Sequence, residues 1–431
     1  MRNRYLDLLR AAAILRVVVY HLFGWPWLSI VLPAMGVMFA LAGSLTAASL
    51  DKRAAGQVIT SRLRRLLPPL WLLALIVVPL MLYAGWTRET DGEAPFNPAK
   101  LVFWLLPVLE PQGSDKGVDS WEPLWYLRAY LWFVLLSPLL HRLYRTIGWG
   151  AVALPIVLIA VLDKTGFTLP DLPDAAMWDF ATFGACWIAG FAHHDGRLAR
   201  LRPGLVVLCS VVLGGAALYW LQGHQGTDAW DLNDVSESQA LWSLAFVLLV
   251  LRWQPPMGWL TRIKPLDRAV DLLNFRAVTV YLWHNIAIAA IWPVLTVLAL
   301  DDLGHLDDPV DLAATLLLTL VAVLAFGWVE DLAARRPPRL WPVGDRPEAA
   351  AATPVAAPPA LPAPPAADVA AQQVTAALPV VSDGSGLWRS QSARAWAVPV
   401  VPGSTHPSAE PDPTIVDDGG GGAWFGPENR R

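Results

Sequence analysis

Two ionisable residues, Arg10 and His21, lie at opposite ends of one apolar stretch near the N-terminus, LLRAAAILRVVVYHLFGW. Their separation is close to three helical turns, so on a helix both side chains share one face, about 16 Å apart along the axis. A charged group in hydrocarbon costs at least a few kcal/mol, which makes such a pair a candidate functional site. Because imidazole suits proton transfer near neutral pH, we predict a catalytic site that includes His21 and Arg10. A histidine that only caps or packs at the interface end of the helix is the alternative.

A basic run, SRLRRLLPPLW, precedes another long apolar stretch. Arg62 and Arg65 are three positions apart and share a helix face, whereas Arg64 lies off that face. Arginine donates two parallel hydrogen bonds to phosphate, so the run predicts a clamp for an anionic substrate. A second interpretation stays open, because basic clusters beside a membrane span also set topology or contact anionic lipid.

Polar side chains also interrupt two later apolar segments. Arg128 follows Trp125 and Tyr126 in WEPLWYLRAYLWF, and no acidic residue lies three or four positions from it. We therefore expect Arg128 to face a cavity or another helix. His284 and Asn285, in VTVYLWHNIAIAA, suit either hydrogen bonds between helices or a substrate site.

The composition places the chain among membrane proteins. Of 431 residues, 55% are hydrophobic and only 16% are charged, whereas soluble domains carry about 25% charged residues. The net charge of −4 says little about partners, because it averages basic and acidic segments. We expect no nucleic-acid partner. The only two cysteines, Cys186 and Cys209, both fall in apolar runs. They indicate neither a disulfide framework nor a cysteine metal site, and we expect no metal ion and no permanently bound cofactor.

Ten predominantly apolar segments are long enough, or nearly so, to cross a bilayer. They lie near residues 8–24, 28–50, 66–85, 123–141, 147–163, 176–193, 204–222, 237–252, 276–299 and 309–329. Lysine and arginine collect in alternate connections, and the other connections are acidic. We therefore predict an all-α integral membrane protein, a bundle of about ten transmembrane helices in the plasma membrane, with both termini cytoplasmic. The apolar piece at 101–109 is too short to span and predicts a re-entrant or interfacial segment.

The composition changes near residue 337, where a Pro/Ala-rich stretch begins and a Gly run follows later. Such a sequence buries too little apolar surface to offset its ordering entropy. We predict a membrane domain at residues 1–336 and a disordered cytoplasmic tail at 337–431.

Several motifs resemble one known family. YLDLLRAAAILRVVVYH resembles the first span of the acyltransferase-3 integral membrane family, whose signature is a basic residue, ten intervening residues and a histidine, here Arg10 and His21. PAMGVMFALAGSL is similar to the family's second span, SRLRRLLPPLW to its arginine motif, PLWYLRAYLW to its Trp-aromatic-Leu element and VYLWHN to its late histidine span. The resemblance covers about residues 3–332. Ile59 and Ala42 depart from the phenylalanine and serine that are common at those positions.

The resemblance implies an O-acyltransferase that transfers acyl groups other than amino-acyl groups. The donor would be cytoplasmic acyl-coenzyme A, by default acetyl-coenzyme A, and the acceptor a hydroxyl of a cell-envelope glycan, glycolipid or secondary metabolite. His21 would act as general base or as an acyl carrier, while Arg62 and Arg65, with Arg64, would bind the coenzyme A diphosphate. The candidate acceptor or oxyanion groups are Trp125, Tyr126, Arg128, His284 and Asn285. Polysaccharide modification in contact with membrane lipid is the corresponding biological setting.

A transporter or exporter of a small anion or glycan fragment is the alternative from another class. Charged groups inside a helical bundle suit a substrate pathway equally well. Paired broken helices in two corresponding halves would favour transport, and the sequence contains no convincing pair. Acyl chain length, acceptor and oligomeric state stay open.

Overall fold

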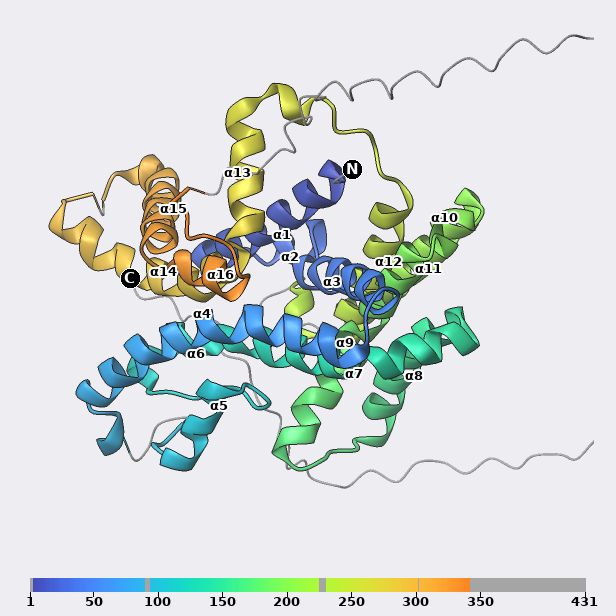
Figure 1. Cartoon of the computed structure of the whole chain (residues 1–431), viewed down its shortest axis with the longest axis horizontal. Helices are drawn as coiled ribbons and strands as arrows, with labels where there is room; N and C mark the ends of the chain where they lie inside the picture. Colours follow the sequence, from blue (N-terminus) through green and yellow to red (C-terminus); the bar gives the residue numbers. More distant parts are fainter. Residues whose placement is uncertain (1–2, 90–93, 225–229, 301, 342–431) are drawn as a thin grey trace, which may run out of the picture. The chain divides into compact units, whose positions relative to one another are not determined.

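The computed structural model describes residues 3–89, 94–224, 230–300 and 302–341, which form helices and no strands (Figure 1). Each of the ten apolar segments contains one long helix, and the segment 28–50 also contains a short one. These are α1 (Arg4–Phe23), α3 (Ala34–Leu50), α4 (Ala55–Tyr83), α7 (Trp125–Ile147), α8 (Trp149–Thr165), α9 (Asp171–His194), α11 (Pro203–Gly223), α12 (Ser236–Arg252), α14 (Ala277–Val297) and α15 (Asp307–Phe326). The shorter ones are α2 (Trp27–Val31), α5 (Val102–Leu105), α6 (Val118–Trp121), α10 (Arg197–Arg200), α13 (Lys264–Phe275) and α16 (Trp328–Ala333).

Six segments in this described part are long and apolar enough to cross a membrane. They are Trp27–Leu50, Ala55–Tyr83, Asp115–Ile147, Pro203–Gly223, Ala277–Val297 and Gly304–Phe326. The other long helices fall short for physical reasons: α8 and α12 have 17 residues each, and α1 carries four charged side chains. The chain is therefore an all-helical membrane protein, while ten crossings and the side of the termini stay predictions. The tail predicted at 337–431 lies outside the described residues, apart from 337–341.

Helix α9 packs against α3, α7, α8 and α12, and its residues 181–192 are all buried. It crosses α3 at glycines. A Cβ atom on Gly43 would come within 2.2 Å of the Trp187 carbonyl oxygen, and one on Gly190 within 2.1 Å of the Ala40 carbonyl oxygen. Only glycine permits so close an approach of two helix backbones. Helices α3 and α9 therefore form one close-packed pair, and α7, α8 and α12 pack against α9.

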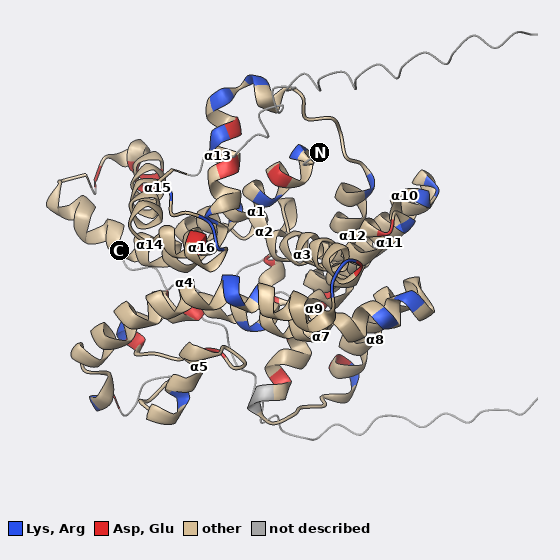
Figure 2. Cartoon of the chain, in the orientation of Figure 1, with Lys and Arg blue, Asp and Glu red and all other residues tan. Residues whose placement is uncertain are grey.

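The N-terminal part of α1 is held by α13, whose charged residues are visible in Figure 2. Arg4 forms ion pairs with Asp267 and, at 2.6 Å, with Asp271. The Asn274 side chain donates a hydrogen bond of 2.8 Å to the Asp7 carbonyl oxygen. These contacts set the position of α1 relative to α14, which follows α13 directly.

Helix α4 begins at Ala55, well before the predicted boundary at residue 66, and continues through Pro68, Pro69 and Pro79. The basic run therefore lies within α4 rather than before it. Arg64 donates to the Ala333 carbonyl oxygen at 3.3 Å, which joins α4 to α16.

A fully buried arginine, Arg276, closes this end of the fold. It donates to the Gly327 carbonyl at 2.7 Å, to Asp331 at 2.7 Å and to the Arg339 carbonyl at 2.6 Å. Burial opposes ionisation of Asp331, but the Arg276 guanidinium, the Arg339 N–H and the charge of Arg336 outweigh it and hold the pKa of that carboxyl below its ordinary value. The chain after α16 is thereby fastened to α14.

Candidate active site

His21 and His284 are in contact although 263 positions separate them. Their ring centroids are 5.3 Å apart in an edge-to-face arrangement. His21 lies in the last turn of α1 and is exposed, whereas His284, in the middle of α14, is completely buried. The pair therefore connects an accessible imidazole to one that is shielded by the fold.

Hydrogen bonding fixes the tautomer of a neutral His284. Its Nδ1 atom lies 2.6 Å from the Tyr281 carbonyl oxygen, which can only accept, so Nδ1 carries the proton. Nε2 then has a free lone pair, and it has no hydrogen-bond partner among the described residues. A buried ring nitrogen without a hydrogen-bond partner destabilises the folded state unless a ligand or another side chain supplies that partner. His284 is thus prepared to accept a hydrogen bond within the bundle.

Aromatic rings continue from this pair toward α7. The Tyr281 ring lies 5.7 Å from the His284 ring and 5.0 Å from the Tyr126 ring, measured between centroids. Tyr126 is in turn 6.3 Å from Tyr130, one turn further along α7. The Tyr281 hydroxyl donates to the Pro123 carbonyl oxygen and so joins α14 to the start of α7. Tyr281, Tyr126 and Tyr130 thus form a continuous row of aromatic rings, here called the aromatic wall, that leads away from the two histidines.

The far end of this wall meets the predicted arginines. Arg10 lies within electrostatic range of Tyr126, Tyr130 and Arg62, and Arg65 lies within range of Arg62 and Tyr130. Helices α4 and α7 meet here at a shallow depression that is too small to hold a ligand, and Figure 2 shows the basic positions of α4 in blue. The depression is lined by Arg62, Leu63, Leu66, Tyr130, Leu131 and Val134. Within the described part of the chain, no ion pair joins Arg10, Arg62 or Arg65 to a carboxylate.

Arg128 faces another helix, as predicted, and its partners are carboxylates. Its guanidinium donates to both oxygens of Asp179 on α9, at 3.1 and 3.2 Å, and to Glu110 at 2.9 Å. Burial raises the pKa of Glu110 to about 7, against the lowering effect of Arg128. Nearby, the Trp125 ring stacks on Phe183, with centroids 5.9 Å apart. Arg128 and Trp125 are thus both engaged with α9.

The sequence analysis did not identify three groups of the site, which are the Tyr130 side chain, the Tyr281 carbonyl and the Glu110 carboxylate. Tyr130 could have been found, because it lies four residues after Tyr126 and so shares its helix face. The Tyr281 carbonyl lies three residues before His284 in the same helix, so its hydrogen bond with Nδ1 is a local contact. The Glu110 carboxylate acts through a tertiary contact with Arg128, which no local pattern reveals. Asn285 is buried next to His284, and its Oδ1 atom has no hydrogen-bond partner in the described structure.

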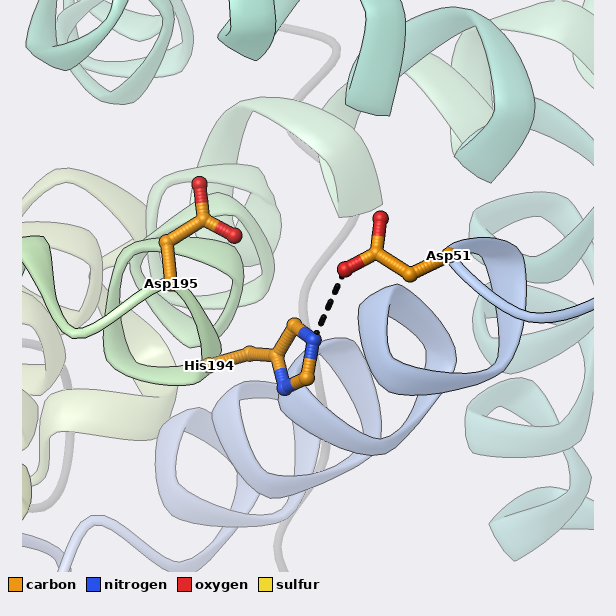
Figure 3. A group of neighbouring side chains, drawn as sticks. All are labelled: Asp51, His194 and Asp195. Carbon is orange, nitrogen blue, oxygen red and sulfur yellow. Dashed lines mark hydrogen bonds and ion pairs between the residues drawn. The ribbon is translucent and has the colours of Figure 1, made fainter. Parts of the chain in front are cut away.

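A second polar cluster lies where α3 and α9 end (Figure 3). One ligand atom from each of Asp51, His194 and Asp195 lies within 4.8 Å of the others, a geometry that could hold a metal ion. Asp51 already has partners within the chain, because Arg145 forms an ion pair with it at 2.8 Å and the His194 ring nitrogen lies 2.9 Å from its other oxygen. Burial opposes ionisation of Asp51, but these two contacts, with His141, lower its pKa. The cluster is therefore satisfied as a link between helices.

Comparison with known families decides the identity of the chain. Residues 3–329 match the family model of an acyltransferase domain. The chain belongs to this acyltransferase family. The match includes Arg10, His21 and the whole aromatic wall, and it confirms the family expected from the sequence motifs. The protein is thus a membrane acyltransferase. No curated protein and no solved structure matches it.

Proposed function

We propose that the protein transfers an acyl group from acyl-coenzyme A, with acetyl as the default, to a hydroxyl, and that His21 is the base. The observation that carries this proposal is the His21–His284 contact at one end of an aromatic wall whose other end meets Arg10 and Arg62. Membership of the acyltransferase family supports acyl transfer as the reaction. The arrangement of the side chains supports donor binding at the arginine end of the aromatic wall and reaction at its histidine end.

The acceptor hydroxyl loses its proton to one ring nitrogen of His21 as its oxygen attacks the thioester carbonyl carbon. The C–S bond then breaks, and the coenzyme A thiolate takes the proton, so the products are an ester and a free thiol. A hydrogen bond from the other ring nitrogen of His21 to Nε2 of His284 would hold the base in the reactive tautomer. This role for His284 is one of positioning, comparable to that of the third member of a catalytic triad.

The arginines suit the donor. Coenzyme A carries a diphosphate, and the guanidinium groups of Arg62 and Arg65, with Arg10 close by, offer several hydrogen-bond donors. The pantetheine arm would then follow the wall formed by Tyr130 and Tyr126 toward His21. The positive-inside bias of the sequence supports donor binding at the cytoplasmic side of the plasma membrane as part of this proposal.

The test uses purified protein with acetyl-coenzyme A and measures release of free thiol. We expect wild type to release thiol, His21→Ala to lose this activity, and Arg62→Ala to raise the KM for acetyl-coenzyme A about tenfold. His284→Ala lowers kcat and shifts the pH profile, whereas His284→Gln, which can still accept through its side-chain oxygen, retains more activity.

Undiminished thiol release in His21→Ala would overturn the assignment of the base. A wild-type protein that neither binds nor cleaves any short acyl-coenzyme A would overturn the donor. In that case transport of a small anion or glycan fragment would become the better supported function.

A further inference from the structure

The two arginines that follow α16, Arg335 and Arg336, bring further positive charge to the basic run of α4. Helix α16 packs against α4 (Figure 1), and Arg64 donates to the carbonyl oxygen of Ala333, two residues before this pair. Arg336 lies close enough to Arg65 for the two charges to act on each other. Arginines from two segments that are far apart in the sequence therefore gather at one place in the fold.

The backbone holds Arg336 in this place before any ligand arrives. Arg335 has a left-handed conformation (φ 56°), which residues with side chains rarely adopt. Its N–H and that of Arg336 donate to backbone carbonyls of α16 at 2.9 and 2.8 Å, so the chain turns sharply where the helix ends. Beyond the turn, the Arg339 carbonyl accepts from Arg276 and the Arg339 N–H donates to the Asp331 carboxylate. A backbone that is ordered in advance loses little entropy on binding.

The fold does not neutralise this positive charge. Among the residues that the structure describes, no ion pair joins Arg64 or Arg65 to a carboxylate. Asp331 lies 3.5 Å from Arg336, but the fully buried Arg276 binds the same carboxylate at 2.7 Å. The Arg336 side chain is also 42% exposed. Because an ion pair that is this exposed contributes little to stability, Arg336 can contact a ligand at little cost.

We propose that Arg336 and Arg64 bind the phosphate monoester of the donor, beside the diphosphate site at Arg62 and Arg65. This proposal rests on the proposed function, which assigns the diphosphate to those two arginines. Coenzyme A carries both groups on one ribose, the diphosphate at the 5′ position and the phosphate monoester at the 3′ position, so their binding sites must be neighbours. Arg65 is within electrostatic range of both Arg62 and Arg336, which meets this requirement.

A phosphate monoester also suits the chemistry of the site. It carries about 1.5 to 2 negative charges at pH 7, and guanidinium groups donate paired hydrogen bonds to its oxygens. The family match ends at residue 329, so Arg336 lies beyond it. Anionic lipid headgroups carry phosphate as well, and basic residues beside a membrane span commonly contact them. A lipid contact needs only general positive charge, whereas the donor needs two phosphate sites side by side.

The test is calorimetry on the full-length protein in nanodiscs of phosphatidylcholine alone. The two probes are coenzyme A and 3′-dephospho-coenzyme A, which lacks the phosphate monoester. We expect wild type to bind coenzyme A about tenfold more tightly than the dephospho form. Arg336→Gln should weaken the binding of coenzyme A about fivefold and change that of the dephospho form by less than about twofold. Arg336→Lys, which keeps the charge without the paired donors, should be intermediate, and Arg62→Gln should weaken both ligands equally.

Arg200→Gln is the matched control, because Arg200 is likewise exposed and ends α10, which packs against α9 and α12. It should leave both dissociation constants unchanged, and an unchanged melting temperature confirms that each variant is folded. Equal affinity of wild type for the two ligands, or an equal loss for both in Arg336→Gln, would overturn the phosphate monoester site.

Two other outcomes separate this inference from its neighbours. An effect of Arg336→Gln that appears only after phosphatidylglycerol is added to the nanodiscs would overturn the donor site in favour of a lipid contact. A wild-type protein that binds neither form of coenzyme A would overturn the donor of the proposed function together with this inference, whereas equal binding of both forms overturns this inference alone.

Discussion

The ion pair between Arg128 and its carboxylates yields the sharpest quantitative prediction. The Arg128 guanidinium is 9% exposed and binds both oxygens of Asp179, with Glu110 as its third contact. Removing one member of a buried pair leaves an uncompensated charge and costs about 3–5 kcal/mol, whereas replacing both members with apolar side chains is often neutral. We therefore expect Arg128→Leu to lower the free energy of unfolding by about 3–5 kcal/mol, and the double variant Arg128→Leu/Asp179→Leu to recover most of this loss.

The loss in Arg128→Leu should depend on pH. Burial already raises the pKa of Glu110 to about 7, and Arg128 is the group that counteracts this. Without Arg128 the pKa rises further above the ordinary value of 4.5. A carboxyl whose pKa is higher in the folded state contributes stability that is lost as pH rises. The single variant is therefore destabilised more at about pH 8 than at about pH 5.5.

The assay is denaturant unfolding in mixed micelles, followed by tryptophan fluorescence at both pH values for wild type, both single variants and the double variant. The coupling energy comes from the double-mutant cycle. A double variant as unstable as the sum of the two singles would refute the ion-pair argument. So would a loss in Arg128→Leu that stays within about 1 kcal/mol at the higher pH, compared with the cost expected for a buried unpaired charge.

Three further predictions concern packing, titration and the donor. Gly43→Leu should lower the melting temperature through a clash with the Trp187 carbonyl, a cost of at least about 1–3 kcal/mol, whereas Gly215→Leu, which meets open space, should not. Burial raises the pKa of Glu330 to about 7 from the ordinary 4.5, so its contribution to stability is full below 4.5 and lost as pH rises through 7. Over that pH range the melting temperature of Glu330→Gln should fall less than that of wild type. Equal slopes of melting temperature against pH would contradict this. Arg65→Ala should weaken coenzyme A binding about fivefold in calorimetry, with Arg65→Lys intermediate, and an unchanged Kd would remove Arg65 from the donor site.

Periodicity predicted what lies on one helix but not what faces it. The spacing of Arg10 and His21 correctly indicated a long helix, and the apolar runs located ten long helices with boundaries in error by up to eleven residues at α4. The family, predicted from short motifs in order, is confirmed by the match over residues 3–329.

The partners of the candidate site could not be predicted because they are set by tertiary packing. His284 was identified as polar and intramembrane, yet its contact with His21 depends on how α1 and α14 are placed by α13. Likewise the isolated position of Arg128 indicated an interhelical partner, but nothing in the local sequence selects Asp179. The roles of these residues in acyl transfer stay predictions until they are measured.

The burial of α9 has a consequence for how the protein is made. Helix α9 carries Asp179 in a helix that the fold covers on several sides, where an unpaired buried carboxylate is costly. Its cation, Arg128 on α7, and its glycine partner on α3 both precede α9 in the chain. The helices before α9 therefore already carry the partners that α9 needs when it packs, and α12, which follows it, completes the cover.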